Sequence, residues 1–544
     1  MSRKKTLLIT ALALCVTAAL AAFLLRDSTF IGGARVARDA ESVESDSVHA
    51  LCGLLRLREP KELELRGSPL TLRQGERLRG RFPDCALRWD VPLSSGRFES
   101  DTTALSLPAV TEEDLNAFSF FPALETLELP EDTPEELVAS LRERAPALRV
   151  CRRIRIGEQS CPSDALSLSF EGDVPLEELS DKLALFPALR TVELRDRSCS
   201  FAELLPLAEA YPAVAWEAEI ELAPGLCVPT DATELTITAE APVSPAALAE
   251  ALSLFPALSR IEYRDCDFSD AELIALRERS DAAVVWETEV CGLRFPTDAE
   301  EIDVSGCTVA GVEAVEDKLP CFDRLRRVIM CECGIDDETM DALDRRHEDI
   351  RFIWTVHFGA FFLRTDATTF IATCFPHGYS FLTNKQVQKL GYCRDLIALD
   401  IGHMYYSDVS FLEKLTKLRY LILADTGVDT VEWARQMPEL CYLELFLTQV
   451  KDLSPLTECR ELRHLNLAYT APNDIAPLCA MPWLERLWMT GARLSDTQRA
   501  ALRQALPDTE LELSLGGSST GGTWRTRPAY FEMRDVFGVF YMEG

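Results

Sequence analysis

The sequence predicts an α/β solenoid, in which helical or irregular return segments join the strands of a curved parallel sheet, preceded by one N-terminal transmembrane helix. Three observations predict this class: a leucine pattern with a short, constant step, a recurrence about three times as long, and an apolar N-terminal segment. A chain of 544 residues is too long for one compact core. Stacked repeats bury apolar side chains that no single repeat can bury alone.

The composition is that of a folded protein and argues against one class of partner. Apolar residues make up 47% and charged residues 26% of the chain, a balance that disordered segments lack. The formal net charge is −32 at pH 7, so the chain offers little that would neutralise phosphates. We therefore expect no nucleic-acid partner, and we expect basic, neutral or sugar-like partners instead.

We interpret residues 1–26 as a cytoplasmic tip and a transmembrane signal-anchor. Basic residues at positions 3–5 precede an uncharged run over residues 6–25, which Arg26 closes. At about 1.5 Å of rise per residue, the run spans roughly 30 Å, enough to cross the hydrocarbon core of a bilayer. The basic end stays in the cytoplasm, so we expect a single-pass protein of the cell membrane whose bulk is extracellular.

Two alternatives for this segment also export the chain. Residues 19–21 form a small-x-small cleavage site, which would give a secreted protein, although the apolar run continues beyond it. A lipoprotein signal is less well supported, because Cys15 lies inside the run and follows Leu14 rather than a small residue. In each case residues 27–50 form a linker to the repeats.

The regular repeats cover residues 371–513. Five copies of L-x-x-L-x-L follow one another at a constant 22-residue step, so three apolar columns align along the chain. Each buried leucine contributes about 1.5–3 kcal/mol, and aligned columns therefore give a continuous core. The first column is Leu396, Leu418, Leu440, Leu462 and Leu484; the second is Leu399, Leu421, Leu443, Leu465 and Leu487; the third is Ile401, Leu423, Leu445, Leu467 and Met489.

Residues 393–513 resemble the short, 22-residue leucine-rich repeats of the internalin type. The resemblance rests on the strand pattern and on the D-[ILV]-x-P-L return at 452–456 and 474–478. The asparagine that usually follows the strand in that family is absent here. We expect a threonine hydroxyl to satisfy the backbone in its place, at Thr426, Thr448 and Thr470.

Residues 51–370 repeat on the longer scale. A Ser/Thr-Asp pair recurs at intervals of about 67 residues, and such self-similarity marks a repeat architecture. One module is thus close to three 22-residue turns. We interpret the region as a divergent leucine-rich-repeat array continuous with the regular one; a series of separate small α/β modules is the alternative. The recurring aspartate is interpreted as a turn residue rather than a ligand: Asp101, Asp164, Asp231, Asp298 and Asp366.

Three further stretches, at 354–358, 363–368 and 400–406, are similar to exported clostridial leucine-rich-repeat proteins. That resemblance implies the fold and a location outside the cell. It carries over no activity.

No motif predicts an enzyme, a cofactor or a metal site. Residues 517–521 match G-x-S-x-G around Ser519, which leaves an envelope hydrolase as a rival function. That pattern requires a helix directly after it, and the chain continues with linker composition instead. Cys321, Cys331 and His347 lack the paired spacing of a zinc site. The 18 cysteines are spread singly, and we expect most of them to be free and buried.

The strand pattern predicts a binding surface. The leucines of each strand point inward, the residues between them point to the concave face, and neighbouring turns stack about 4.8 Å apart. Residues of one column therefore become lateral neighbours and form an aromatic, weakly basic patch of the types that dominate interfaces. The predicted site residues are Tyr420, Tyr442, Glu444, Phe446, His464, Asn466, Arg486 and Trp488.

We predict a non-enzymatic extracytoplasmic binding scaffold that recognises a protein or an envelope glycan through this face. An envelope hydrolase and a purely structural envelope spacer are the alternatives, and the aromatic residues could also be ordinary packing residues or be covered by the tail. Residues 514–544 combine a Gly/Ser linker with an aromatic, arginine-rich tail. Capping of the last repeat is the first interpretation of this tail; folding back over the concave face and docking on a partner are the alternatives.

Overall fold

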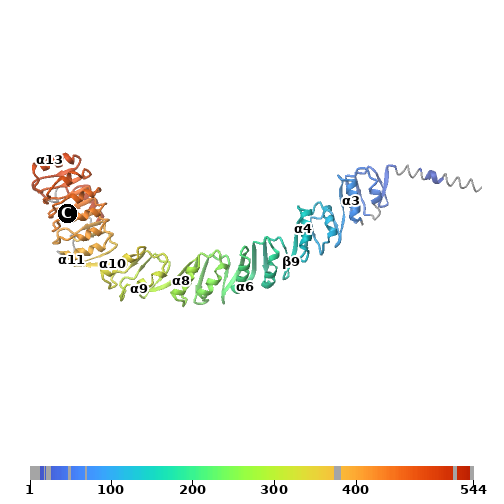
Figure 1. Ribbon diagram of the computed structural model, residues 1–544, viewed down its shortest axis with the longest axis horizontal. Coiled ribbons are helices and arrows are strands. Elements are labelled where there is room, and N and C mark those ends of the chain that lie inside the picture. The colour runs from blue at the N-terminus through green and yellow to red at the C-terminus, as the bar shows by residue number, and fades with distance from the viewer. Residues whose placement is uncertain are drawn as a thin grey trace, which may run out of the picture. The chain divides into compact units, whose positions relative to one another are not determined.

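The computed structural model describes residues 13–17, 19, 26–46, 51–67, 70–372, 381–518 and 523–538. The chain, drawn in Figure 1, divides into two compact units: residues 1–261 with 279–282 make up unit 1, and residues 262–278 with 283–544 make up unit 2. Most of the predicted transmembrane run lies outside the described residues. Among the helices that the structure does describe, none has both the length and the apolar character needed to span a bilayer.

Unit 1 is built from modules with one recurring order of elements. Each has a parallel strand, a short helical segment, a second parallel strand, a ten-residue helix, and a third parallel strand that turns back as an antiparallel hairpin. A hairpin of β1 (Ser28–Ile31) and β2 (Ala34–Ala37) comes first. The first module contains β3 (Ser42–Glu44), α2 (Leu51–Leu54), β4 (Glu62–Leu65), α3 (Leu72–Arg81), β5 (Ala86–Leu93) and β6 (Gly96–Glu99).

The next two modules of unit 1 keep this order. The second contains β7 (Ala104–Ser106), η1 (Glu112–Phe120), β8 (Thr126–Pro130), α4 (Glu135–Arg144), β9 (Arg149–Ile156) and β10 (Gln159–Pro162). The third contains β11 (Ser167–Glu171), α5 (Leu176–Lys182), η2 (Leu183–Leu185), β12 (Thr191–Ser200), α6 (Phe201–Ala210), β13 (Ala215–Ala223) and β14 (Leu226–Pro229). The unit ends with β15 (Glu234–Thr238), α7 (Pro245–Ala251) and η3 (Leu252–Leu254), and β16 (Arg260–Arg264) lies at the division in the sequence.

Unit 2 begins with elements of the same modular kind. They are α8 (Asp270–Arg279), β17 (Ala283–Val290), β18 (Leu293–Pro296), β19 (Glu301–Asp303), α9 (Glu313–Glu316), η4 (Leu319–Cys321), β20 (Arg327–Ile329), α10 (Asp337–Arg346), β21 (Arg351–Ile353), β22 (Thr355–Phe358) and β23 (Phe361–Arg364).

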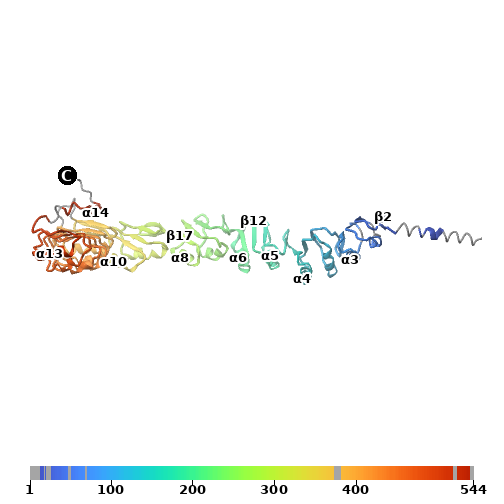
Figure 2. The ribbon, with the colours of Figure 1, turned by 90° about the horizontal axis from the view of Figure 1, so that it is seen from above.

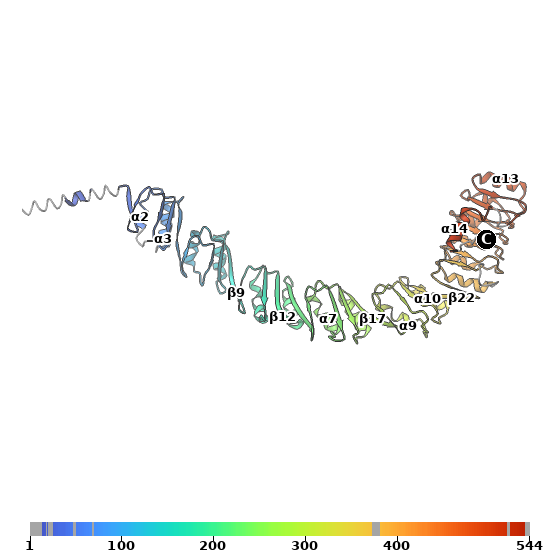
Figure 3. The same ribbon diagram turned by 180° about the vertical axis from the view of Figure 1, so that it is seen from behind.

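The rest of unit 2 is one seven-stranded parallel sheet with short return segments (Figure 3). Its strands are β24 (Thr369–Ile371), β25 (Ala398–Asp400), β26 (Tyr420–Ile422), β27 (Tyr442–Glu444), β28 (His464–Asn466), β29 (Arg486–Trp488) and β30 (Glu510–Glu512). The return segments are α11 (Asn384–Val387), η5 (Gln388–Tyr392), η6 (Ser410–Lys414), η7 (Glu432–Gln436), η8 (Ser454–Glu458), α12 (Ala476–Cys479) and α13 (Asp496–Ala505), and α14 (Pro528–Val536) follows the sheet.

The parallel sheet is not continuous through the modules, which differs from the predicted continuous array over residues 51–370. In unit 1 each module has its own sheet, in the orders β3-β4-β5-β6, β10-β9-β8-β7 and β11-β12-β13-β14. The reason lies in the third strand of each module. Strands β5, β9 and β13 continue into an antiparallel partner, which occupies the sheet edge that another parallel strand would need.

A buried hydroxyl closes each hairpin. The backbone N–H of Trp89 donates to Ser100 Oγ (3.1 Å) in unit 1, and that of Trp354 donates to Thr365 Oγ1 (3.2 Å) in unit 2. The same bond recurs at Ser163, Thr230 and Thr297. These residues are the first members of the recurring Ser/Thr-Asp pairs. The aspartates that follow them all lie in turns, as predicted.

The strand residue whose backbone N–H donates to this hydroxyl has a side chain that corresponds in type to the first residue of the module's ten-residue helix. An ion pair joins Arg152 to Glu135. Where the helix starts with Leu72, the indole N–H of Trp89 has no hydrogen-bond partner in the described part of the chain. In unit 2 the strand position holds tryptophan and the helix position holds aspartate. The indole N–H of Trp286 donates to Asp270 (2.8 Å), and that of Trp354 donates to Asp337 (3.1 Å). A lysine forms an ion pair with each aspartate: Lys318 with Asp270, and Lys389 with Asp337.

The regular repeats form a leucine-rich-repeat solenoid with one strand in each turn. Adjacent strands pair residue for residue, with Leu421 opposite Leu399 on one side and Leu443 on the other. All five leucines of the second column are fully buried. The constant repeat length therefore places every column in lateral register, as the sequence predicts.

Three residues after each of the strands β25 to β29 comes a residue of left-handed conformation, and after β25 to β28 a hydroxyl then satisfies the backbone. Leu447 has φ +59°, and Thr448, which follows it, donates its hydroxyl to the carbonyl of Leu445 (2.6 Å). Thr426 and Thr470 make the same bond at 2.6 Å in their own turns. The first turn has methionine at this position, and the hydroxyl of Tyr406 donates to the equivalent carbonyl of Ile401 (2.7 Å). The prediction that a hydroxyl replaces the usual amide is confirmed.

We predict that Thr448→Val weakens the C-terminal repeats by about 1 kcal/mol, because the substitution keeps the side-chain volume and removes one buried hydrogen bond. The measurement is hydrogen–deuterium exchange of the amides around β27 and β28, which should quicken. Thr416→Val, at an exposed position, is the matched control. Equal exchange in the two variants would contradict the assigned role.

Candidate binding face

Strands β26 to β29 bring the predicted site residues together as lateral neighbours. Tyr442 lies opposite Tyr420 on one side and His464 on the other, and Arg486 follows His464 in the same column. The second column runs Ile422, Glu444, Asn466 and Trp488. We call the side of the sheet that carries these residues, with Phe446, the concave face.

The C-terminal segment 523–538 covers this face. Trp524 is fully buried (0% exposed), and Tyr530, Met533 and Phe537 from α14 and its end are buried with it. All four belong to one apolar cluster with Tyr442, Phe446 and Trp488. Figure 2 shows α14 against the C-terminal repeats, on the side away from α13. Of the three interpretations of the tail, the structure therefore shows the second, folding over the concave face, and not capping. Aromatic side chains across several strands offer the tail more apolar contact than one terminal turn does.

The indole of Trp524 sits in a slot with specific contacts. Its Nε1–H donates to Glu444 Oε1 (2.9 Å), and its backbone carbonyl accepts from Arg486 Nη2 (2.8 Å). The Arg486 guanidinium lies over the indole, 4.1 Å from the ring centroid. Ring centroids of Tyr442 and Trp488 lie 5.7 and 5.9 Å away. The slot therefore holds a large aromatic side chain from three directions and hydrogen-bonds both its ring and its backbone.

Burial dominates the electrostatics under the tail. Desolvation raises the pKa of Glu444, although hydrogen bonds from the Tyr442 hydroxyl and the Trp524 indole favour its charged form. Desolvation, reinforced by Arg486 and Arg463, lowers the pKa of His464 to about 4, so this imidazole is neutral at pH 7. Desolvation also lowers the pKa of Arg486.

Two polar groups under the tail have no hydrogen-bond partner among the described residues. They are Nη1 of Arg486 and Nδ1 of His464. Arg486 is only 5% exposed, and no described carboxylate lies within ion-pair distance of it. The tail therefore fills the apolar slot but leaves part of the buried guanidinium unsatisfied.

The remaining predicted residues differ in their burial and in their contacts. Asn466 is fully buried, and its Oδ1 accepts from the backbone N–H of Ala468 (3.0 Å), so it supports the strand end. Phe446 is buried against the ring of His403, with centroids 5.8 Å apart. Tyr420 and His464 are half-buried, and His464 lies between Tyr442 and Arg486 in its column. At the level of the sequence, the aromatic and arginine content of the tail gives coverage of this face as an alternative, but it does not single out Trp524 or α14 as the parts that pack there.

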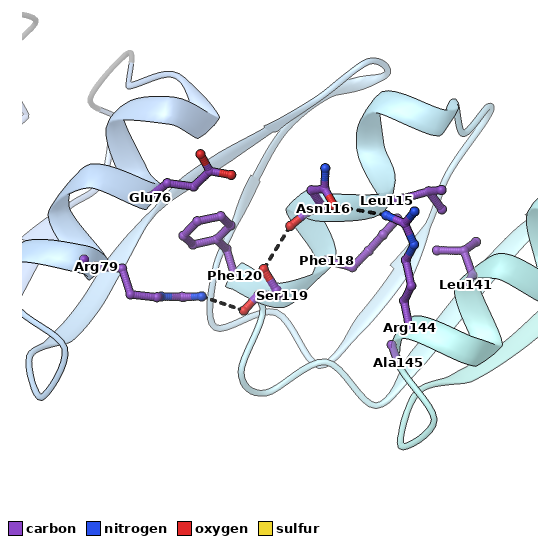
Figure 4. Close-up of a pocket in the computed structure, with 11 residues that line it drawn as sticks. Glu76, Arg79, Leu115, Asn116, Phe118, Ser119, Phe120, Leu141, Arg144 and Ala145 are labelled. Atoms are coloured by element: carbon purple, nitrogen blue, oxygen red, sulfur yellow. Dashed lines mark hydrogen bonds between the residues drawn. The ribbon is translucent and has the colours of Figure 1, made fainter.

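A second hollow, of about 560 Å³, lies in unit 1 between α3, η1 and α4 (Figure 4). Arg79 stacks over Phe120, 4.0 Å from the ring centroid, and donates to the carbonyl of Ser119 (2.9 Å). On the other side Arg144 donates to Asn116 Oδ1 (3.0 Å). Burial lowers the pKa of Arg79. Arg79 thus joins the first module to the second, whereas Arg144 joins α4 to η1 within the second module.

The residues considered for metal binding do not gather into a metal site in the described part of the chain. Ser519 lies outside the described residues, and the carbonyl of Gly517, close to it in the sequence, accepts from the Tyr469 hydroxyl (2.7 Å). In the described part of the chain no three His, Cys, Asp or Glu side chains are arranged to hold a metal ion. The described cysteines are free, and they include buried ones; desolvation raises the pKa of Cys393 to about 12 and that of Cys459 to about 11.

Among solved structures, the chain is similar to two internalins of Listeria monocytogenes. Internalin C2 is 21% identical over a match that covers 27% of this chain and 72% of that chain, with a TM-score of 0.20. Internalin F is 12% identical over 63% of this chain and 84% of that chain, with a TM-score of 0.22. Likeness at this level carries no inference, and the fold rests on the strand register. No protein-family model matches the sequence, and no curated protein does.

We predict that Trp524→Ala releases the tail, because it removes a fully buried indole, a change that costs about 3–5 kcal/mol in protein cores. Hydrogen–deuterium exchange of residues 523–538 should rise in this variant. Phe531→Ala, at a residue of α14 that is 48% exposed, is the matched control and should leave exchange unchanged. Slow exchange in both variants would show that the indole does not hold the tail.

Proposed function

We propose that this chain is a non-enzymatic protein-binding scaffold, and that its concave face recognises a segment of a protein partner. The observation that supports the proposal is that the face already accommodates a peptide segment. Trp524 and α14 lie in a slot that supplies an acceptor, a cationic donor and three aromatic or guanidinium surfaces. Tyr, Trp and Arg, which dominate protein interfaces, make up most of this slot.

A protein segment suits this face better than an envelope glycan does. The rings of Tyr442 and Trp488 pack on the indole of Trp524 and share one apolar cluster with Met533 and Phe537, which are contacts that protein side chains supply. Helix-in-groove recognition, in which an amphipathic helix lays an apolar stripe into a groove, is the mode that α14 displays. Its buried residues Tyr530, Met533 and Phe537 recur at three and four positions, which places them on one face of the helix.

The membrane location is proposed together with this function. A chain anchored by residues 6–25 would present its repeats outside the cell. We predict that a membrane-impermeant maleimide labels the exposed Cys227 in intact cells, with lysed cells as the control for total reactivity. Alkaline carbonate washing then separates the two forms: retention in the membrane indicates an uncleaved anchor, and release indicates cleavage. Labelling of Cys227 only after lysis would contradict export.

The binding function predicts that an opened face binds the tail sequence added as a separate peptide. The probe is a fluorescent peptide of residues 523–538, and the protein is the full chain with Trp524→Ala and Met533→Ala, which weaken its own tail. We expect binding at least about tenfold tighter than to the parent chain, because a tethered tail competes at an effective concentration of the order of millimolar.

Two results decide this test. Adding Tyr442→Ala to the opened chain should abolish peptide binding, because Tyr442 forms one wall of the slot. Equal binding of the peptide to the parent and the opened chain would show that it attaches elsewhere, and the proposed face would be wrong. Fluorescence anisotropy measures both.

A further inference from the structure

The tail leaves polar groups of the face that it covers without hydrogen-bond partners in the described part of the chain. Arg486 is 5% exposed and donates through Nη2 to a neutral acceptor, the Trp524 carbonyl, at 2.8 Å. Its Nη1 has no hydrogen-bond partner among the described residues. The neutral, half-buried His464 lies beside it in the same column, and its Nδ1 is likewise unpartnered within the described chain. The slot thus offers more hydrogen-bonding capacity than the tail uses, and the unused positive charge is that of Arg486.

The carboxylates near Arg486 are engaged elsewhere. Glu510 lies opposite Arg486 on the next strand, but it accepts from Nε of the tail residue Arg527 (3.2 Å). Glu444 accepts from the Tyr442 hydroxyl and from the Trp524 indole. The guanidinium is therefore left with a neutral carbonyl as its acceptor and an indole ring as its neighbour.

A ligand carboxylate at the position of the Trp524 carbonyl would satisfy this guanidinium better. Arg–carboxylate pairs can be bidentate, with two parallel N–H···O bonds, and charge-assisted hydrogen bonds are about twice as strong as neutral ones. A buried guanidinium gains most from such a pair, because water does not compete for it. The aromatic ring and the carboxylate would then be held at once, by the slot and by Arg486.

We propose that the partner is a protein segment that carries a large aromatic side chain with a carboxylate beside it, and that it displaces the tail by pairing that carboxylate with Arg486. The tail is then an internal competitor that a matching segment removes. This inference rests on the proposed function of the concave face. The carboxylate can come from a chain terminus at the aromatic residue or from an adjacent aspartate or glutamate side chain.

The test uses small probes on the full-length Trp524→Ala chain, in which the indole slot is vacated. The probes are N-acetyltryptophan, N-acetyltryptophanamide, and N-acetyl-tryptophyl-aspartic acid α-amide, whose side-chain carboxyl is free, so they differ in whether and where they carry a carboxylate. We expect N-acetyltryptophan, the aspartyl probe, or both to bind about tenfold more tightly than the neutral amide, the difference between a charge-assisted and a neutral hydrogen bond. Isothermal titration calorimetry measures the affinities.

Matched variants separate the contributions. Adding Arg486→Met to Trp524→Ala should remove the preference for the charged probes and leave weak binding of all three. Trp524→Phe keeps the slot filled and should bind none of them. A preference for N-acetyltryptophan indicates a terminal carboxylate, and a preference for the aspartyl probe indicates a side-chain carboxylate.

The outcomes distinguish the two proposals. If the neutral amide binds as tightly as both charged probes, the carboxylate inference is overturned and peptide binding by the face stands. If no probe binds although the tail peptide does, the indole slot is not the anchor and the inference is again overturned. If neither probes nor peptide bind, the function of the face is wrong. As a measurement free of substitutions, N-acetyltryptophan but not its amide should speed hydrogen exchange of residues 523–538 in the parent chain, and equal effects would overturn the inference.

Discussion

The lateral register of strands β25 to β29 is the constraint on which the C-terminal half of unit 2 depends. Because every turn returns to the strand after the same length of chain, Leu421 lies opposite Leu399 and Leu443 without a shift. That register buries the leucines on one side and, with the same spacing, aligns Tyr442, His464 and Arg486 on the other. Core and binding face are thus two consequences of one repeat length, and a one-residue insertion in a strand would disturb both.

The regular repeats could be predicted from the sequence because their signal is local and repeated. Columns of leucine, and a threonine such as Thr448 after each strand, fix both the stacking and its hydrogen bonds. The separate sheets of unit 1 could not be predicted in this way, since a module of about three turns has the same apolar content whether its sheet continues or stops. The signal was the length of strands such as Ala215–Ala223, whose alternation of buried and exposed residues runs past the parallel pairing into a hairpin.

The candidate site was predictable as a set of neighbours but not as a surface. Strand alternation places Tyr442, Glu444 and Trp488 on one side of the sheet, and register makes them neighbours. Nothing in that pattern specifies where Trp524, which follows the last strand and the linker, will pack. Contacts between distant segments depend on complementary shape and hydrogen bonding. Here an indole N–H meets a buried carboxylate, and a carbonyl meets a buried guanidinium.

The matched pairs between strand and helix within the modules bear on how such a chain can diversify. Arg152 faces Glu135, whereas Trp354 faces Asp337, which also binds Lys389. Exchanging the helices between these two modules would still place a carboxylate at each position. The exchanged side chain would be one methylene longer or shorter, because glutamate and aspartate differ by that group, and each carboxylate would lose its present partners. Recombination is therefore tolerated best when whole modules move, with the strand and the helix inherited as a unit. An array lengthened by duplicating complete modules keeps every strand–helix pair intact, whereas the lysine partners of Asp270 and Asp337 come from the following segment of the chain.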